Sequence, residues 1–184
     1  MIRMPTTKKA AAKTPKKPST AGSSEKSASV ALEGKKAPAF ELLDADGKPV
    51  ALKDLIGSSN LVLYFYPKDM TPGCTIEACS FRDNIAPIKK LGAKVVGISG
   101  DSTDSHGKFI AKHDLNFPLL ADPGNKVCKL YGVYKMKSLY GRQFLGIERT
   151  TFVIDKAGIV RRVFPKVKVN GHTEEVIEAL KEIA

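Results

Sequence analysis

The segment "NLVLYFYPKDMTPGCTIEACSFRD", residues 60–83, decides the fold because a strand, a loop and a helix follow one another within it. Residues 61–66 form a continuous apolar run that is typical of a strand buried on both faces of a sheet. The Pro and Gly residues that follow predict a loop. A helix is then predicted from Gly73 to Leu91, with Gly92 as its stop.

The rest of the chain repeats this alternation of strands and helices. A short strand at Phe40–Leu43 leads into a turn centred on Asp46-Gly47. We expect a helix at Ser102–Asp114 and a last helix opened by Thr173. Further strands are predicted at 93–99, within 117–125, at 150–155 and at 159–164, and a short helix at 128–131. Together these elements predict an α/β sandwich around a mixed sheet.

Length and composition favour one intracellular domain. A chain of 184 residues with 42% hydrophobic residues suits a single core. Its longest apolar run is too short to cross a bilayer, and no secretory signal pattern appears, so neither secretion nor a membrane partner is expected. The three cysteines do not form a disulfide framework, which indicates a reducing compartment. We expect the cytoplasm, or the nucleus in a eukaryotic source.

The N-terminal segment carries much of the net charge of +11. Its first thirty residues contain Arg3 and six lysines against Glu25, a net charge of +6. Because it lacks aromatic residues and is rich in Lys, Ala, Ser, Thr and Pro, residues 1–29 are predicted to be a disordered tail before a domain at 30–184. The tail is either a solubilising extension, a nuclear localisation signal or a weak, salt-sensitive nucleic-acid contact. Its prolines disfavour a transit peptide.

Cys74 follows a Thr-Pro-Gly turn at the predicted start of a helix. In the first turn, unpaired backbone N–H groups and the helix dipole favour a thiolate over a thiol. Thr71 can offer its hydroxyl to the sulfur or to an oxygen bound beside it. Arg149 can supply a fixed positive charge from a neighbouring strand. This combination predicts a nucleophilic thiolate that holds a peroxide for attack.

Cys79 lies five residues after Cys74 on the same predicted helix. Five residues correspond to about 7.5 Å of rise and roughly 140° of rotation. That separation exceeds the usual Cα distance across a disulfide and points the two side chains apart. A bond between Cys74 and Cys79 therefore requires the first turns of the helix to unwind. Pro87, which is expected in the same helix, could set where the unwinding stops.

These residues resemble the peroxiredoxins of the bacterioferritin comigratory protein (PrxQ) group. The pattern Pro-x-x-x-Thr-x-x-Cys is matched by Pro67, Thr71 and Cys74 within "YFYPKDMTPGCTIEACSFRD". Arg149 in "GIERTTFVID" matches the distal arginine of the group. Cys79 stands where members with a resolving cysteine on the same helix have it. The similarity reaches the end of the chain and excludes the N-terminal tail.

The resemblance implies a monomeric thiol peroxidase with a thioredoxin-like fold. Such an enzyme reduces hydrogen peroxide and organic hydroperoxides to water and alcohols, in antioxidant defence and redox homeostasis, without a metal, haem or other cofactor. Cys74 would become a sulfenic acid and Cys79 would condense with it. Thioredoxin or a similar dithiol protein would then reduce the disulfide.

The resemblance also suggests supporting roles for the residues around the sulfur. Thr71 and a backbone N–H would polarise the peroxide, while Arg149 stabilises charge in the transition state. Pro67 would shield the sulfur from water, and Glu77 would orient Arg149. Tyr66, a strand residue of the core, could also wall the pocket.

Each of these residues has a structural alternative. Cys74 could be a small buried residue, and Cys79 could face the core while an external thiol resolves the sulfenic acid. Thr71 could merely cap the helix, and Arg149 could be a charge at a sheet edge. Cys128 is interpreted as a free core cysteine. The histidines lack metal-ligand spacing and are interpreted as surface or packing residues: His106, His113 and His172.

Two other functional classes compete with the peroxidase. A general disulfide reductase or thiol sensor would share the fold, but that chemistry normally uses Cys-x-x-Cys, which this chain lacks. A binding protein tethered to nucleic acid through its lysines would leave the domain chemistry secondary. Consumption of peroxide would distinguish the peroxidase from the disulfide reductase or sensor. A salt-dependent mobility shift with DNA would support the binding protein.

Overall fold

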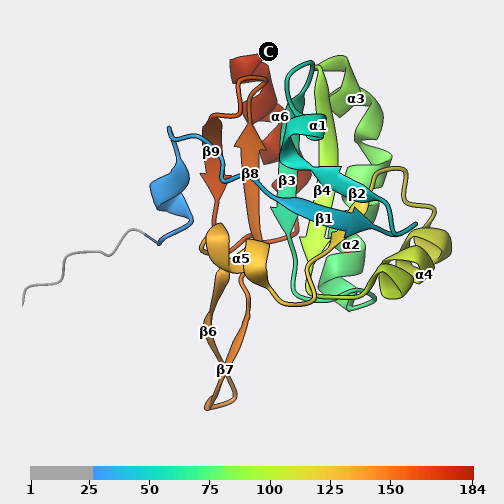
Figure 1. Ribbon diagram of the computed structural model, residues 1–184, viewed down its shortest axis with the longest axis vertical. Helices are drawn as coiled ribbons and strands as arrows, with labels where there is room; N and C mark the ends of the chain where they lie inside the picture. Colours follow the sequence, from blue (N-terminus) through green and yellow to red (C-terminus); the bar gives the residue numbers. More distant parts are fainter. Residues whose placement is uncertain (1–26) are drawn as a thin grey trace, which may run out of the picture.

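A seven-stranded mixed sheet forms the centre of the computed structural model, which describes residues 27–184 (Figure 1). The strand order is β2-β1-β5-β4-β3-β8-β9, in which β3, β4 and β5 are parallel and the other neighbours are antiparallel. The α/β sandwich with a mixed sheet is therefore confirmed. The strands are β1 (Glu41–Asp44), β2 (Pro49–Ala51), β3 (Asn60–Phe65), β4 (Ala93–Ser99), β5 (Leu119–Ala121), β8 (Thr150–Ile154) and β9 (Val160–Phe164).

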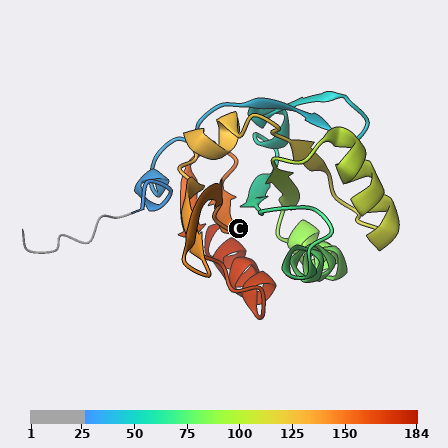
Figure 2. The same cartoon turned by 90° about the horizontal axis from the view of Figure 1, so that it is seen from below.

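Strand β3 is buried along its whole length, between the two cores that lie on opposite faces of the sheet. Successive side chains of a strand point to opposite faces, so Leu61, Leu63 and Phe65 join one core while Val62 and Tyr64 join the other. Helices α1 and α5 cover the first core, and α2, α3, α4 and α6 cover the second (Figure 2). The helices are α1 (Leu52–Leu55), α2 (Pro72–Asp83), α3 (Ile85–Lys90), α4 (Thr103–His113), α5 (Lys126–Leu130), α6 (His172–Ile183) and the 3₁₀ helix η1 (Val30–Leu32).

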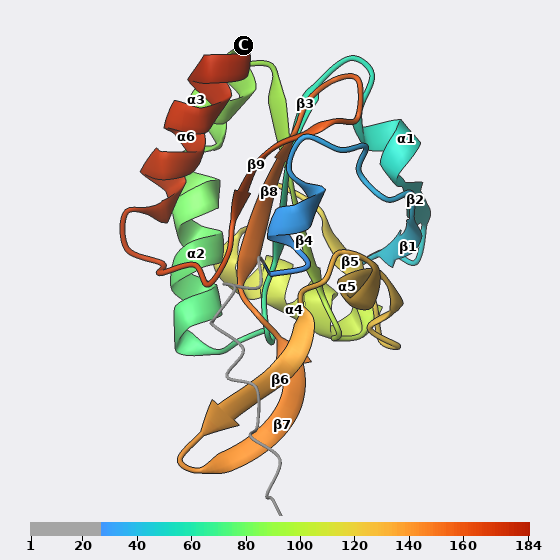
Figure 3. The same ribbon diagram turned by 90° about the vertical axis from the view of Figure 1, so that its left-hand side faces the viewer.

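A separate hairpin projects from this sandwich. Strands β6 (Tyr134–Leu139) and β7 (Arg142–Ile147) pair only with each other and extend away from the sheet (Figure 3). Their two turn residues, Tyr140 and Gly141, both have positive φ angles, as a tight two-residue hairpin turn requires. This hairpin was not predicted from the sequence, although β7 leads directly to Arg149.

The long helix predicted after the motif loop is in fact two helices. Helix α2 ends at Asp83 and α3 begins at Ile85, with Asn84 between them. Pro87 explains the break, because it has no N–H to bond the Asp83 carbonyl and its ring would clash there. The expectation that Pro87 lies in the same helix as the cysteines was wrong.

Two predicted boundaries also shift. Helix α6 begins at His172 after Gly171, so Thr173 lies inside the helix rather than opening it. Ser29 is fully buried, and a side chain on Gly132 would collide with Ala28 and Ser29, so the packed domain includes residues assigned to the tail. The rest of the predicted disordered tail, residues 1–26, lies outside the described residues. No helix in the described part of the chain has the length and apolarity that crossing a bilayer requires.

Candidate active site

The end of β3 and the start of α2 place Cys74 at the edge of the sheet. Thr71 has extended backbone angles at the N-cap position, and Pro72 occupies the first helical position, where its missing N–H costs nothing. Cys74 therefore lies in the first turn of α2, as predicted. Its side chain is only 1% exposed, in the core beneath the helix.

Arg149 joins Cys74 to Glu77. Its Nη2 donates a hydrogen bond to Cys74 Sγ at 3.3 Å, and its Nη1 donates to Glu77 Oε2. Gly73 makes room for this contact, because a Cβ there would lie 3.2 Å from Arg149 Nη2. The guanidinium supplies a positive charge and a donor at the sulfur, which stabilise a thiolate. Arg149 lies in the link between β7 and β8, not within a strand as expected.

Glu77 is a buried carboxyl group whose pKa lies near neutral pH. Its side chain is 1% exposed, and Oε1 has no hydrogen-bond partner within the described chain. Burial raises the pKa of Glu77 to about 7, even though Arg149 opposes the shift. Burial and the nearby Glu77 and Cys74 likewise raise the pKa of Tyr64 well above its ordinary value. Tyr64 is thus a neutral phenol beside the site.

The other predicted residues lie around the site without contacting the sulfur through a polar bond. Thr71 is half-buried and its hydroxyl donates to the Lys68 carbonyl at 2.9 Å, so its side chain neither caps α2 nor reaches Cys74. Pro67 is half-buried in the same loop. Tyr66 is fully buried and donates to Asp69 Oδ1 at 2.6 Å, which makes it a support of the loop.

Cys79 lies further along the intact α2, and all three cysteines are free thiols. It is half-buried and opens into a surface hollow of about 420 Å³ that is also lined by Ile76 and Asp83. Cys128 is fully buried, as expected for a core cysteine, and burial and the adjacent Asp122 raise its pKa strongly. The half-buried Cys79 is therefore the thiol that lies on the same helix as Cys74 and reaches the surface.

Comparison with known proteins agrees with this geometry. The model of the AhpC/TSA family matches residues 33–163. The chain belongs to the AhpC/TSA family. A putative peroxiredoxin bcp of Coxiella burnetii is 50% identical over 147 residues, covering 80% of this chain and 97% of that protein. Peroxiredoxin Bcp of Bacillus subtilis is 47% identical over 151 residues, covering 82% of this chain and 96% of that protein.

Solved structures give the same assignment. A structure of peroxiredoxin Q from Xanthomonas campestris has 43% sequence identity and a TM-score of 0.74, covering 78% of this chain and 90% of that one. The resemblance stated from the motif residues is thus confirmed, and with it the thioredoxin-like fold. This AhpC/TSA protein is a peroxiredoxin, an oxidoreductase that reduces peroxides with a thiol.

A buried polar network anchors the loop of this peroxiredoxin. His106 on α4 contacts Asp69 Oδ2 through Nδ1 at 2.8 Å and the Leu120 carbonyl through Nε2 at 3.1 Å. Burial would raise the pKa of Asp69, but hydrogen bonds from His106, Tyr66 and Ser105 outweigh it and lower the pKa. From the sequence, His106 was predicted only to be a surface or packing residue. A spacing of 37 residues between the partners offered no local signal.

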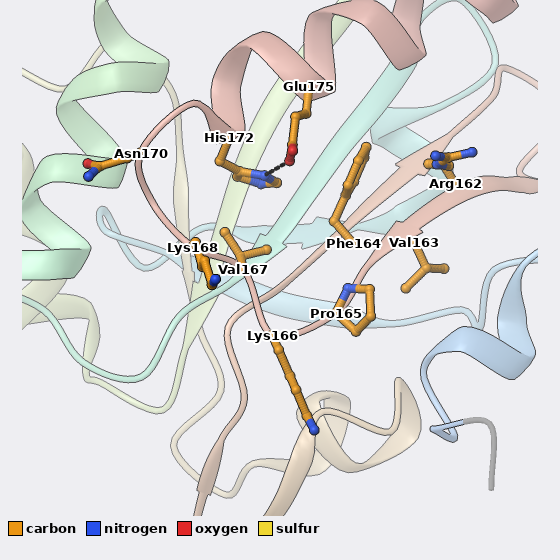
Figure 4. A pocket seen from close by; sticks show the side chains of 10 residues that line it. All are labelled: Arg162, Val163, Phe164, Pro165, Lys166, Val167, Lys168, Asn170, His172 and Glu175. Atoms are coloured by element: carbon orange, nitrogen blue, oxygen red, sulfur yellow. Dashed lines mark ion pairs between the residues drawn. The ribbon is translucent and has the colours of Figure 1, made fainter. Parts of the chain in front are cut away.

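A second hollow, of about 360 Å³, lies at the start of α6 and is lined by the end of β9 and the loop that follows it (Figure 4). His172 lies in its wall, 3.6 Å from Glu175, while Lys166 and Asn170 point away from the ring. Burial lowers the pKa of His172, which packs as a neutral ring, in line with the predicted packing role. The adjoining loop fixes the backbone of Arg149, because the Val167 N–H donates to the Arg149 carbonyl at 2.9 Å.

Residues 27–184 contain no group of three His, Cys, Asp or Glu side chains that could hold a metal ion.

Proposed function

We propose that Cys74 is the peroxide-reducing thiolate of this peroxiredoxin and that Cys79 resolves it. The single observation that carries the assignment is the Arg149 guanidinium 3.3 Å from Cys74 Sγ in the first turn of α2. Arg149 stabilises the thiolate and also faces the place where a peroxide oxygen would approach. Its second nitrogen is fixed by Glu77, so it is oriented before substrate arrives.

The reaction begins when the Cys74 thiolate attacks the terminal oxygen of a hydroperoxide. The O–O bond breaks, Cys74 becomes a sulfenic acid, and the departing alkoxide or hydroxide takes up a proton to leave as an alcohol or water. Arg149 stabilises the charge that moves onto the leaving oxygen. The backbone N–H of Cys74 lies in the first turn of α2 and would hold the peroxide, while the Thr71 hydroxyl would have to turn from the Lys68 carbonyl to join it.

Resolution follows through a local change of structure. The Cys79 thiol attacks the sulfenic sulfur, water leaves, and a Cys74–Cys79 disulfide forms. The two cysteines lie about 7.5 Å apart along the helix axis, so α2 must unwind between them. Thioredoxin or a similar dithiol protein then reduces the exposed disulfide. We propose that the enzyme works in this way as a cytoplasmic monomer on hydrogen peroxide and organic hydroperoxides.

An intact-mass measurement tests the cycle. The reduced protein receives one equivalent of hydrogen peroxide, and a non-reducing peptide map follows. The expected product has lost two hydrogens and links Cys74 to Cys79. The variant Cys79→Ser should instead accumulate a sulfenic acid on Cys74, while Cys128→Ser, the matched control, should behave as the parent chain.

Two outcomes would change the assignment. A sulfenic acid on Cys74 with no link to Cys79 in the parent chain would keep the peroxidase chemistry and assign resolution to an external thiol. A Cys74 thiol that stays reduced while peroxide persists would exclude it as the nucleophile.

A further inference from the structure

The motif loop, residues 67–71, holds a backbone conformation that its own sequence disfavours. Met70 has a φ angle of 62°, in the left-handed region, although it is not a glycine. A residue with a Cβ stays in that region only where the surrounding structure holds it there. Thr71, the next residue, is the N-cap of α2. The conformation of Met70 therefore sets where the helical turn that contains Cys74 begins.

Asp69 is the residue that ties this loop to the rest of the fold. Its carboxylate accepts a hydrogen bond from the Tyr66 hydroxyl at 2.6 Å and another from Ser105 Oγ at 2.7 Å. Its Oδ2 also lies 2.8 Å from His106 Nδ1, and the side chain is only 2% exposed. The backbone N–H of Asp69 donates to Asp101 Oδ2 at 2.8 Å. The end of β3, the helix α4 and the bend after β4 thus all hold this one residue.

The hydrogen-bond partners of His106 show where its protons lie. Nε2 is 3.1 Å from the Leu120 carbonyl, which can only accept, so Nε2 carries a proton. Burial would raise the pKa of Asp69, but the hydrogen bonds that it accepts outweigh burial and lower the pKa, so this group is a carboxylate. The proton between the two side chains therefore stays on His106 Nδ1. Asp69 and His106 form a buried ion pair, and charge-assisted hydrogen bonds of this kind are stronger than neutral ones.

We propose that Asp69 is a positioning residue for the reduction of peroxide. Its ion pair with His106 keeps Met70 in the left-handed conformation, and this fixes the backbone from Thr71 to Cys74. The hydroperoxide is held against that backbone while the sulfur attacks it. Asp69 acts through the loop, without contact to the substrate, and its role rests on the proposed peroxidase function of Cys74.

Formation of the thiolate and alignment of the peroxide depend on different parts of the site. Arg149, which stabilises the Cys74 thiolate, comes from the link between β7 and β8 and is oriented by Glu77. The partners of Asp69 lie instead at the end of β3, on α4 and after β4. A misplacement of about 1 Å can slow an aligned reaction by about 10²-fold. A loosened loop should therefore slow the reaction with peroxide and leave the thiolate in place.

Two reactions of Cys74 in the reduced full-length protein separate these contributions. Oxidation by hydrogen peroxide needs an aligned substrate, whereas alkylation by iodoacetamide needs only a thiolate that the reagent can reach. Peptide mass measures the loss of the free Cys74 thiol in both reactions.

Asp69→Asn should slow the oxidation of Cys74 about 30-fold, while alkylation is no slower than in the parent protein. Asparagine keeps the size of the side chain. Its NH₂ group, however, faces other donors, and it has no charge to pair with His106. Circular dichroism checks that the variant is folded.

The matched control is Asp155→Asn. Asp155 also accepts three hydrogen bonds, from two backbone N–H groups and from the Arg161 side chain. It follows β8 at the end of the sheet opposite to the motif loop, because Ile154 pairs with Leu61 at the start of β3. Oxidation of Cys74 in this variant should proceed at the parent rate.

Tyr66→Phe is a milder second variant. It removes one hydrogen bond to Asp69 and keeps the aromatic ring in the core. Oxidation of Cys74 should slow about fivefold, again with no slower alkylation. This variant decides the question if Asp69→Asn does not fold.

Three results on the variants would overturn the proposal. The first is oxidation of Asp69→Asn at nearly the parent rate. The second is a parallel fall of oxidation and alkylation, which would make Asp69 a support of the fold or of the thiolate. The third is an Asp69→Asn chain that does not fold together with parent-like oxidation of Tyr66→Phe. A parent protein whose Cys74 is alkylated but never oxidised would instead refute the proposed peroxidase function, and the positioning role with it.

Discussion

Glu77 should make the stability of the reduced enzyme fall as pH rises through the neutral range, and Glu77→Gln should remove that fall. The carboxyl group is buried at 1% exposure, with one oxygen bonded to Arg149 and the other without a partner. The folded protein must therefore either keep a buried carboxylate with only one of its oxygens bonded, or protonate that carboxylate.

The magnitude follows from the pKa difference. Burial raises the pKa of Glu77 from 4.5 to about 7, so between these values the folded state holds a proton that the unfolded state has lost. Stability is then fully present below pH 4.5 and declines until the folded group ionises near pH 7. At about 1.4 kcal/mol per pKa unit, this one group lowers the free energy of unfolding by about 3 kcal/mol across the window.

Urea denaturation of the reduced protein between pH 5 and pH 8 measures the effect. Other titrating groups contribute equally to both proteins, so the difference between the parent and Glu77→Gln isolates this carboxyl. Glutamine preserves the volume and can still accept a hydrogen bond from Arg149. Between pH 5 and pH 8 the parent should lose roughly 2.5 kcal/mol more than the variant.

Parallel stability profiles for the two proteins would refute the reasoning. They would mean that the folded enzyme stabilises the carboxylate as strongly as water does. Burial would then not raise the pKa of Glu77. A variant that is less stable than the parent at every pH by a constant amount would lead to the same conclusion.

Two further predictions concern the arginine and the loop. Arg149→Lys should slow peroxide consumption by roughly 10² to 10³-fold with little change in the circular dichroism spectrum, because a lysine cannot bond Cys74 and Glu77 together; a less than tenfold effect would contradict this role. His106→Asn should lower the free energy of unfolding by about 3 kcal/mol in urea denaturation, since the buried Asp69 loses a donor. An Asp69→Asn background should reduce that loss, and equal losses in both backgrounds would exclude the coupling.

Local chemistry explains why much of the site could be predicted from the sequence. The apolar run of β3, the proline at the first position of α2 and the position of Cys74 in its first turn all depend on neighbours along the chain. The pairing of Arg149 with Glu77, 72 residues apart, came only from the family resemblance. The ionisation of Glu77 depends on burial, which no local pattern reports.

The hairpin and the loop network escaped prediction for related reasons. Strand β6 has lysines at alternate positions, and only Tyr134 at its base packs against a core. It therefore carries neither a buried run nor a continuous apolar stripe that faces the sheet. Asp69 lies in the loop after β3 and His106 lies on α4, so the two meet only through the tertiary fold. Thr71 was predicted to face the sulfur, but its hydroxyl turns toward Lys68 within its own loop.

The position of Glu77 between the two cysteines couples its charge to the unwinding of α2. A Cys74–Cys79 bond requires the intervening residues to leave the helix, and Glu77 then returns to water, where its pKa is near 4.5. Above neutral pH the unwound form therefore recovers the free energy that the buried charge costs, so ionisation of Glu77 favours disulfide formation. The large apolar anchor Phe81 lies beyond Cys79, and the buried side chains released with Glu77 are the small ones of Cys74 and Ala78. Unwinding thus forfeits little hydrophobic burial, because the end of α2 stays packed while its first turns open.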